Sequence, residues 1–302
     1  MIIELEKECS IEAVSRLMGL SWDEGWGVMG RAVRRGLARK ERRIPERIGV
    51  DEKSFAKRHK YETLIYDLDR RCVEYVTDGR TEESLAEYYL RFEKEERKEI
   101  KVVAMDMWEA YIGATKAHVP DAEKKIVFDK FHVVQYMTKA VDKVRKAENA
   151  ELSGQGNDWL KNTKWLWLAN EENIPQWRRP EFEELKKRDL KVGRAWAIKE
   201  NLRNFWDCKT KQQAKKFFKK WYWWATHSRL KPVIDAARTL KNHLKNILTY
   251  FDHHVTNALG ESINSKIEKI KKTACGYRNR DHYKTAIYFH CGGLDLYPKF
   301  NP

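Results

Sequence analysis

Three aspartates lie within or directly after short apolar runs, and this placement predicts a site built from carboxylates. Asp51 interrupts the run Ile48–Phe55 and is the most informative of the three, because aspartate is a poor strand former. Asp106 follows the run Ile100–Met105, and Asp129 follows Lys125–Phe128. Both precede helix-like segments, so each has a second explanation as a helix N-cap.

Carboxylates brought together at one edge of a sheet have a defined chemistry. If the strands of Asp51 and Asp106 are neighbours, the two groups converge, and they cannot comfortably both ionise unless a cation compensates them. Hard divalent cations with oxygen ligands are the natural partners. A third carboxylate allows two metal ions about 4 Å apart, which activate the attacking oxygen and stabilise the leaving oxygen in phosphodiester displacement.

The elements that must position these acids alternate between strands and helices. The pattern predicts a meander of three antiparallel strands, then a helix, a strand, a helix, a strand and a long helix. Their expected ranges are 48–55, 60–69, 72–76, 81–92, 100–105, 107–118, 125–128 and 131–147. The last two strands reach their neighbours through helices, which favours parallel pairing. This order matches an α/β fold of the ribonuclease-H-like kind, with a mixed sheet flanked by helices.

The segment Ile11–Arg35 is predicted to form two helices around a turn at Gly19–Leu20. Ser21 with Glu24 three residues later is a capping box, which marks the start of the second helix. That helix carries three cations towards its end, Arg31, Arg34 and Arg35. The pattern fits a DNA-binding helix-turn-helix and, equally well, an ordinary helical hairpin with a solvated basic face. A basic run, 36–46, follows as a predicted linker.

Between Asn149 and Tyr250 the strand patterns disappear, and we expect an all-α insertion of several helices with breaks at Gly154–Gly156, Pro175, Pro180 and Pro232. A lysine cluster without an intervening acid precedes the aromatic run Trp221–Trp224. The cluster consists of Lys209, Lys211, Lys215, Lys216, Lys219 and Lys220. Lysines beside aromatic residues are typical of nucleic-acid binding, in which the cations follow the backbone and the rings stack on bases. In the alternative interpretation the tryptophans pack the core, which we expect for at least half of them, while the lysines contact phosphate.

The composition indicates a polyanionic partner. The 302 residues include 60 Lys and Arg against 45 Asp and Glu, a net charge of +15, and the pI is near 9.4. This balance favours nucleic acid, and a merely soluble basic protein is the alternative on composition alone. Five cysteines without a Cys-x-x-Cys pair argue against a disulfide scaffold and a thiolate zinc site. No signal peptide or membrane-length apolar stretch is visible, so we expect a soluble cytoplasmic protein associated with the nucleoid.

The last predicted helix follows Thr256–Asn257. Its apolar stripe consists of Val255, Leu259, Ile263, Ile267 and Ile270. Glu261 lies off that stripe, and by pattern alone it is an ordinary glutamate on a polar helix face.

Five stretches of the chain resemble blocks of bacterial insertion-sequence transposases. They are Ile48–Phe55, Val103–Tyr111, Val127–His132, Asn257–Ile267 and His290–Leu296. The blocks are long and keep the family order, and with the N-terminal helices they cover nearly the whole chain. On these residues the chain resembles the ISL-three group of DDE transposases.

The resemblance implies a ribonuclease-H-like catalytic domain with an α-helical insertion before its last catalytic helix. It implies Asp51, Asp106 and Glu261 as the catalytic, metal-binding triad, with Asp129 as an auxiliary acid outside it. The implied parts are a helix-turn-helix in 1–43, the catalytic domain in 44–148 and 251–302, and the insertion in 149–250. Full-length members usually begin with a cysteine-rich zinc-binding module that this sequence lacks. We therefore expect either a truncated copy or end recognition through the helix-turn-helix alone.

The implied function is cleavage at insertion-sequence ends followed by strand transfer, with Mg²⁺ or Mn²⁺ and two ions expected. Water attacks first, and the freed 3′-hydroxyl then attacks target DNA. Phosphate contacts that position the DNA are expected from the insertion cluster and from Lys266, Lys269, Lys271 and Lys272. A homodimer on double-stranded DNA is expected because two ends must meet. The alternatives are a non-catalytic DNA-binding protein derived from a transposase and a ribonuclease-H-like nuclease without strand transfer.

Overall fold

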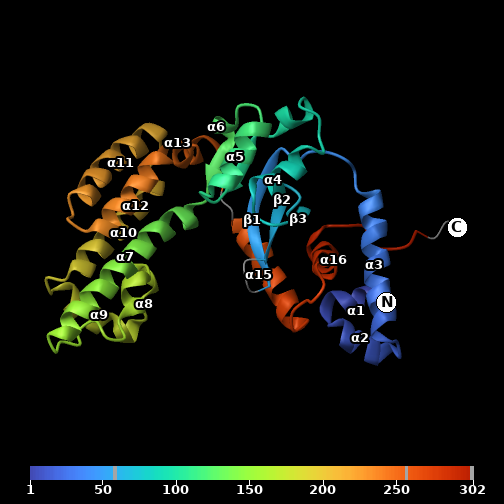
Figure 1. Ribbon diagram of the computed structural model, residues 1–302, viewed down its shortest axis with the longest axis horizontal. Coiled ribbons are helices and arrows are strands. Elements are labelled where there is room, and N and C mark those ends of the chain that lie inside the picture. The colour runs from blue at the N-terminus through green and yellow to red at the C-terminus, as the bar shows by residue number, and fades with distance from the viewer. Residues whose placement is uncertain (57–59, 256–257, 300–302) are drawn as a thin grey trace. The chain divides into compact units, whose positions relative to one another are not determined.

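The computed structural model describes residues 1–56, 60–255 and 258–299, and the chain divides into two compact units (Figure 1). We call Met1–Ile126 together with Val255–Pro302 the sheet unit, and Val127–His254 the helical unit. The sheet unit is therefore discontinuous in sequence, and the helical unit is inserted into it.

A five-stranded mixed sheet, in the order β3-β2-β1-β4-β5, forms the core of the fold. Its strands are β1 Arg47–Ala56, β2 Lys60–Asp67, β3 Cys72–Asp78, β4 Val102–Met105 and β5 Ile126–Phe128. The pairs β1–β2 and β2–β3 are antiparallel, whereas β1 and β4 are parallel. The predicted meander and the predicted parallel return of the fourth strand are thus confirmed, and the fold is of the α/β class.

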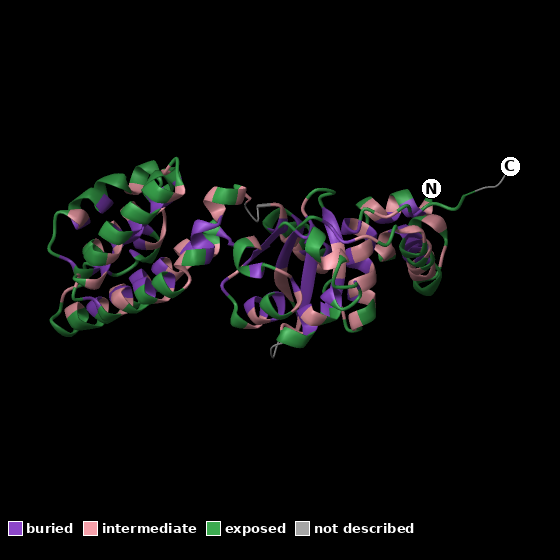
Figure 2. Cartoon of the chain, turned by 90° about the horizontal axis from the view of Figure 1, so that it is seen from above, coloured by how far each residue is buried: buried purple, intermediate pink, exposed green. Residues whose placement is uncertain are grey.

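Helices cover both faces of this sheet. Side chains alternate between the faces along each strand, so successive residues pack against helices on opposite sides. On one face Thr63 bonds Tyr111 of α5 (2.9 Å between the hydroxyls), and α4 packs beside it. On the other face Leu64 and Tyr66 join a buried core with Ile267 of α15 and with α16. The bounds are α4 Glu82–Tyr89, η1 Glu96–Glu99, α5 Glu109–His118, α6 Ala122–Lys125, α15 Ala258–Thr273 and α16 Arg280–Cys291. The buried sheet between exposed outer helix faces is visible in Figure 2.

Three N-terminal helices precede the sheet: α1 Ile2–Glu8, α2 Ile11–Met18 and α3 Trp22–Arg39. Gly19 ends α2 with a φ of +68°, a left-handed conformation that glycine adopts without strain. The capping box is confirmed, since Glu24 N donates to Ser21 Oγ (3.2 Å) and Ser21 N donates to Glu24 Oε2 (2.8 Å). The linker expected from residue 36 was wrong at its start, because α3 continues to Arg39.

The reason for the longer helix lies at the other end of the chain. Residues 292–297, which we call the C-terminal strap, lie against α3. A Cβ added at Gly36 would stand 2.7 Å from Leu294 Cβ, so glycine is needed there for close approach rather than to end the helix. Arg35 donates to the carbonyl of Leu296, and Arg39 forms an ion pair with Asp295.

The helical unit contains helices only beyond Phe128 in the part that the structure describes. Its elements are α7 Lys130–Gly154, α8 Lys164–Leu168, η2 Glu171–Asn173, η3 Gln176–Arg178, α9 Arg179–Lys186, α10 Lys191–Arg203, η4 Asn204–Asp207, α11 Lys211–Thr226, α12 Lys231–Asn242, α13 Leu244–Leu248 and α14 Tyr250–His253. The predicted breaks fall at element boundaries. Pro180 and Pro232 stand in the first turns of α9 and α12, where proline's missing N–H costs nothing.

Fewer tryptophans than expected pack the core of the helical unit. Four of its nine are buried, among them Trp167 and Trp221, whose Nε1 donates to the carbonyl of Ile198. Trp223 and Trp224 are 63% and 40% exposed. The expectation that at least half are core residues was therefore wrong. The buried face of α11 includes Trp221 but not Trp223 or Trp224.

The five cysteines are free thiols, in agreement with the absence of a disulfide pattern. The described helices include none that combines the length and the apolarity needed to cross a bilayer.

Candidate active site

The parallel pair of β1 and β4 ends two residues before Asp51 and Asp106. Gly49 of β1 lies opposite Ala104 of β4 in the parallel pair. Asp51 follows two residues later within β1, and Asp106 follows two residues later, directly after the end of β4. If the register continued to these positions, the two would lie about 5 Å apart at the backbone, on the same face. Both side chains are partly buried. The convergence of the two carboxylates expected from the sequence stays a prediction.

A chain of hydrogen bonds holds the Asp51 carboxylate. Asn264 Nδ2 donates to Asp51 Oδ2 (2.6 Å), and the hydroxyl of Tyr66 donates to Asn264 Oδ1 (2.9 Å). Burial raises the pKa of Tyr66 well above its usual value, with the Asp51 charge adding to the effect, so the phenol keeps its proton. Asn264 acts as an orienting group for Asp51.

Sequence reasoning missed Asn264 and Tyr66. A usable signal was the spacing between Glu261 and Asn264, because residues three apart lie on one side of a helix.

Glu261 lies in the first turn of α15, exposed and one turn before Asn264. The helix follows β1 in the same direction, because Asn264 contacts Asp51 while Glu268 pairs with Lys53 (3.4 Å) further along both elements. Lys271 then donates to the carbonyl of Ser54. Glu261 precedes Asn264 by one turn of α15, so this alignment places it on the N-terminal side of Asp51 along β1.

The donor set suits a hard divalent cation in its chemistry. Carboxylate and amide oxygens are the ligands that Mg²⁺ prefers. Within the described residues, however, no group of three or more His, Cys, Asp or Glu side chains lies close enough to hold a metal. Asp51 directs one carboxylate oxygen to Asn264 instead. The three predicted ligands thus lie on adjacent elements without forming a closed coordination shell.

The structure distinguishes Asp106 from Asp129. Asp129 caps α7, since its Oδ1 accepts from the N–H groups of Phe131 (2.7 Å) and His132 (3.3 Å). Asp106 does not cap α5, whose N-cap residue is Trp108, and its Oδ1 accepts from the next N–H, that of Met107. The capping explanation therefore applies to Asp129, whose auxiliary role stays a prediction.

The cations predicted to contact DNA in the sheet unit differ in how they are engaged. Arg31 and Arg34 are exposed on α3, as are Lys269 and Lys272 on α15. The other three donate to backbone carbonyls: Arg35 to Leu296, Lys266 to His290 and Lys271 to Ser54. A structural role is thus visible for the second group, and the DNA contacts of both groups stay predictions.

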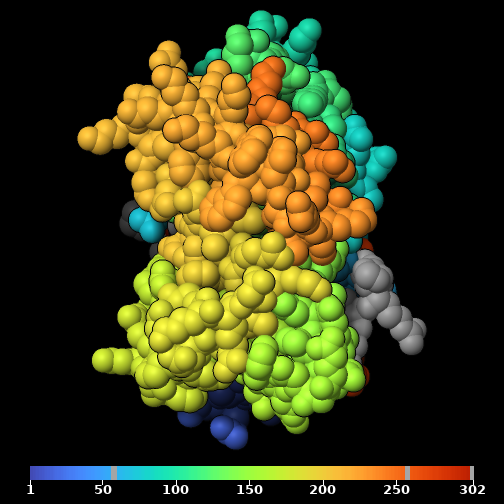
Figure 3. Space-filling model, turned by 90° about the vertical axis from the view of Figure 1, so that its left-hand side faces the viewer, coloured from blue at the N-terminus to red at the C-terminus, as the bar shows by residue number. Residues whose placement is uncertain are grey.

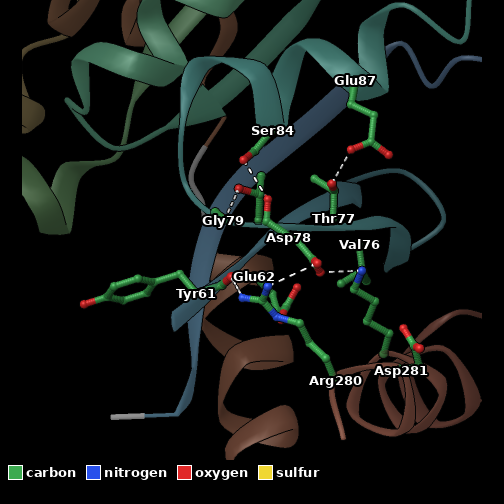
Figure 4. Close-up of polar contacts among 12 residues, drawn as sticks. Tyr61, Glu62, Val76, Thr77, Asp78, Gly79, Ser84, Glu87, Arg280 and Asp281 are labelled. Atoms are coloured by element: carbon green, nitrogen blue, oxygen red, sulfur yellow. Dashed lines mark hydrogen bonds and ion pairs between the residues drawn. The ribbon is translucent and has the colours of Figure 1, made fainter. Parts of the chain in front are cut away.

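A second charged cluster lies on the same face of the sheet, where Arg280 meets two acids (Figure 4). Arg280 Nε donates to Glu62 Oε1 (2.6 Å), and its Nη1 lies 3.1 Å from Asp78 Oδ2. Burial raises the pKa of Glu62 to about 7 against the opposing charge of Arg280. Because the cation at the start of α16 is shared by both carboxylates, this cluster fixes the helix to the sheet.

Most of the positive charge of the chain belongs to the helical unit. Residues 127–254 contain 27 Lys and Arg against 15 Asp and Glu, which is +12 of the net +15. Lys215, Lys216, Lys219 and Lys220 are exposed on α11. A polyanion is therefore expected to bind this unit more strongly than the sheet unit.

A protein-family model described as "Transposase" matches residues 48–287. The transposase for insertion sequence element IS1001 of Bordetella parapertussis is 27% identical over 283 residues, covering 93% of this chain and 69% of that protein. The transposase for insertion sequence element IS1557 of Mycobacterium tuberculosis is 26% identical over 299 residues, covering 90% of this chain and 66% of that protein. The chain spans about two thirds of the length of these relatives.

Proposed function

The chain belongs to the ISL3 family of DDE transposases, and on that premise we propose that it cuts DNA at the ends of an insertion sequence and joins those ends to target DNA. The observation that supports the proposal is the parallel pairing of β1 with β4, the strand that directly precedes Asp106. The family match spans both strands and continues through α15. In this proposal the sheet unit is a ribonuclease-H-like catalytic domain interrupted by a helical insertion.

Asp51, Asp106 and Glu261 would hold the divalent cations, Mg²⁺ or Mn²⁺ and two in number. When bound, such ions neutralise the scissile phosphate and activate the attacking oxygen. Asn264 orients the carboxylate of Asp51 through its amide, and Tyr66 fixes that amide in turn. The three acids lie on three different elements, so bringing them together depends on the docking of α15 against β1.

The DNA partner would be gripped mainly through its phosphates. The exposed lysines of α11 and Lys269 and Lys272 of α15 supply charge without base specificity. The helices α2 and α3 would act as a helix-turn-helix, and the exposed cations Arg31 and Arg34 of α3 would contact DNA. Two copies would act together as a homodimer, because two ends must be brought to one target site.

The test is incubation of the protein with Mg²⁺ and DNA that carries the ends of its own element. We expect nicking at the ends and joined products from the wild type. The variants Asp51→Ala, Asp106→Ala and Glu261→Ala should lose at least about 1,000-fold in rate, because each removes a group that acts on the transition state. Asp69→Ala is the matched control, since this exposed acid lies in the turn after β2 and forms an ion pair with Arg47.

Each outcome has a distinct meaning. Full activity of Asp51→Ala contradicts the site assignment, whereas binding without cleavage by the wild type supports the non-catalytic alternative. Nicking without joining indicates a nuclease.

A further inference from the structure

Two stripes of exposed side chains run along α11, and each leads from lysines to a tryptophan. Residues four apart lie above one another on a helix. One stripe is Lys216, Lys220 and Trp224, and the other is Lys215, Lys219 and Trp223. Figure 3, in which α11 is gold, presents the space-filling surface of the helical unit. A cationic path therefore ends at aromatic rings on the same face of one helix.

The four lysines of these stripes are available for a ligand. None of them forms an ion pair or hydrogen bond with a described residue, whereas Lys211 at the start of the same helix pairs with Asp252. Elsewhere in the unit Lys161, Lys187 and Lys191 also pair with acids. Four unpaired like charges on adjacent turns repel one another unless an anion compensates them. A phosphate backbone is such an anion.

Trp224, at the end of the first stripe, lines a cavity of about 510 Å³ within the helical unit. Asn201, Asn204 and Asp207 line the same cavity, and their side chains form no hydrogen bond or ion pair with a described residue. Trp196 also lines the cavity, with a buried Nε1–H that finds no acceptor among the described residues. The cavity thus combines a ring for stacking with unsatisfied donors and acceptors.

The charges around the cavity distinguish a base from a phosphate. Glu172 and Glu200 also line it, and both are compensated by Arg203 (2.8 and 2.9 Å to Nη1). With Glu171 and Asp207 the lining has four carboxylates against two cations, Lys130 and Arg203, so the interior disfavours a phosphate group. A nucleobase is neutral, and its amino groups donate to carboxylate and amide oxygens.

We propose that this cavity binds a single unpaired base of DNA, stacked on Trp224, while the flanking phosphates lie along Lys216 and Lys220. The inference rests on the proposed function in one respect, namely that DNA is the partner. Stacking of a base on an aromatic ring tolerates any sequence, because every base has a π-face. The volume is within the range of pockets that enclose small organic ligands. The helical unit thereby recognises a distorted duplex rather than a paired one.

The test compares two duplexes of equal length in metal-free buffer, one fully paired and one with a single bulged 2-aminopurine. We expect the wild-type chain to bind the bulged duplex about 5- to 150-fold more tightly, the range that one stacked base contributes. The fluorescence of the bulged probe should be quenched on binding. Trp224→Ala should abolish both the preference and the quenching, and Trp224→Phe should restore most of each.

Two controls separate stacking from charge and from misfolding. Trp177→Ala removes a tryptophan that is 80% exposed in the same unit but does not line the cavity, and it should leave the preference unchanged. Lys216→Ala with Lys220→Ala should weaken binding of both duplexes alike. Equal affinity of the wild type for the two duplexes, or loss of the preference in Trp177→Ala, overturns the proposal. If the wild type cleaves element ends yet shows no preference for the bulge, this inference fails while the proposed function stands.

Discussion

Asp51 and Asn264 are 213 residues apart in the sequence and meet through one hydrogen bond of 2.6 Å. The bond settles which way the carboxylate faces, and Tyr66 settles which way the amide faces. In metal sites such supporting partners commonly change affinity or activity by 10- to 100-fold. The roles of Asn264 and Tyr66 can therefore be tested by substitution, as can the role of Asp51 itself.

Asn264→Leu keeps the approximate side-chain volume and removes the hydrogen bond to Asp51. We expect cleavage to slow about 10- to 100-fold and the Mg²⁺ concentration for half-maximal rate to rise, with DNA affinity unchanged. Tyr66→Phe should show the same changes with a smaller magnitude. Single-turnover cleavage across a Mg²⁺ series measures both, with the exposed neighbour Ser265→Ala as control. A wild-type Mg²⁺ profile in Asn264→Leu would contradict the orienting role.

Glu6 makes stability depend on pH. The side chain is fully buried, neither carboxylate oxygen has a hydrogen-bond partner among the described residues, and burial raises its pKa from 4.5 to about 7 against the opposing charge of Arg31. Between these values the folded state retains a proton that the unfolded chain releases. The contribution of Glu6 to the free energy of unfolding is therefore fully present below pH 4.5. It is lost as the pH rises through 7, and the loss is at most about 3 kcal/mol.

The measurement is urea unfolding of Glu6→Gln and wild type at pH 5 and pH 8. The wild type should lose stability between the two, and the variant should lose markedly less because its amide does not titrate. Glu4→Gln is the control, since Glu4 is exposed and pairs with Lys7 (3.3 Å). Identical pH slopes for Glu6→Gln and wild type would refute the assignment.

At the scale of elements, α3 offers a matched pair of glycines. A Cβ at Gly36 would stand 2.7 Å from Leu294 Cβ, whereas a Cβ at Gly30 meets only Nη1 of Arg34, at 3.6 Å. Gly36→Ala should destabilise the protein by about 1–3 kcal/mol through overpacking. Gly30→Ala should stabilise it by about 0.5–1 kcal/mol through helix propensity. Thermal unfolding of both variants tests the docking of the C-terminal strap. Changes in stability of opposite sign support the docking, and changes of the same sign contradict it.

The elements that the sequence predicted are those whose signals are local. Alternation and apolar runs specify β1 to β5, and Ser21 with Glu24 specifies the start of α3. The features that were missed depend on distant contacts: Gly36 is helical because of Leu294, and Asn264 matters because of Asp51. Glu261 gave no local signal, and its importance came from the family resemblance alone.

The distribution of charge over the whole molecule makes the helical unit the expected site of salt-dependent DNA binding. Replacing Lys215, Lys216, Lys219 and Lys220 together by alanine should lower the slope of log affinity against log salt by about 3 to 4, because each phosphate contact releases counterions. The control removes four lysines that pair with acids, Lys161, Lys187, Lys191 and Lys231. It changes the net charge equally, so an equal change of slope would show that only total charge matters.

The insertion of the helical unit into the sheet unit also has a consequence for synthesis on the ribosome. β1 to β4 emerge first, and the 128 residues of 127–254 must then be translated before α15 and α16. At roughly 5 to 20 residues per second that takes roughly 6 to 25 seconds. Throughout this interval the sheet lacks the helices that bury Leu64 and Tyr66, so the nascent chain presents an apolar surface that a chaperone can bind. Asp51 and Asp106 are therefore made well before Glu261, and the proposed triad cannot assemble until translation has passed α15.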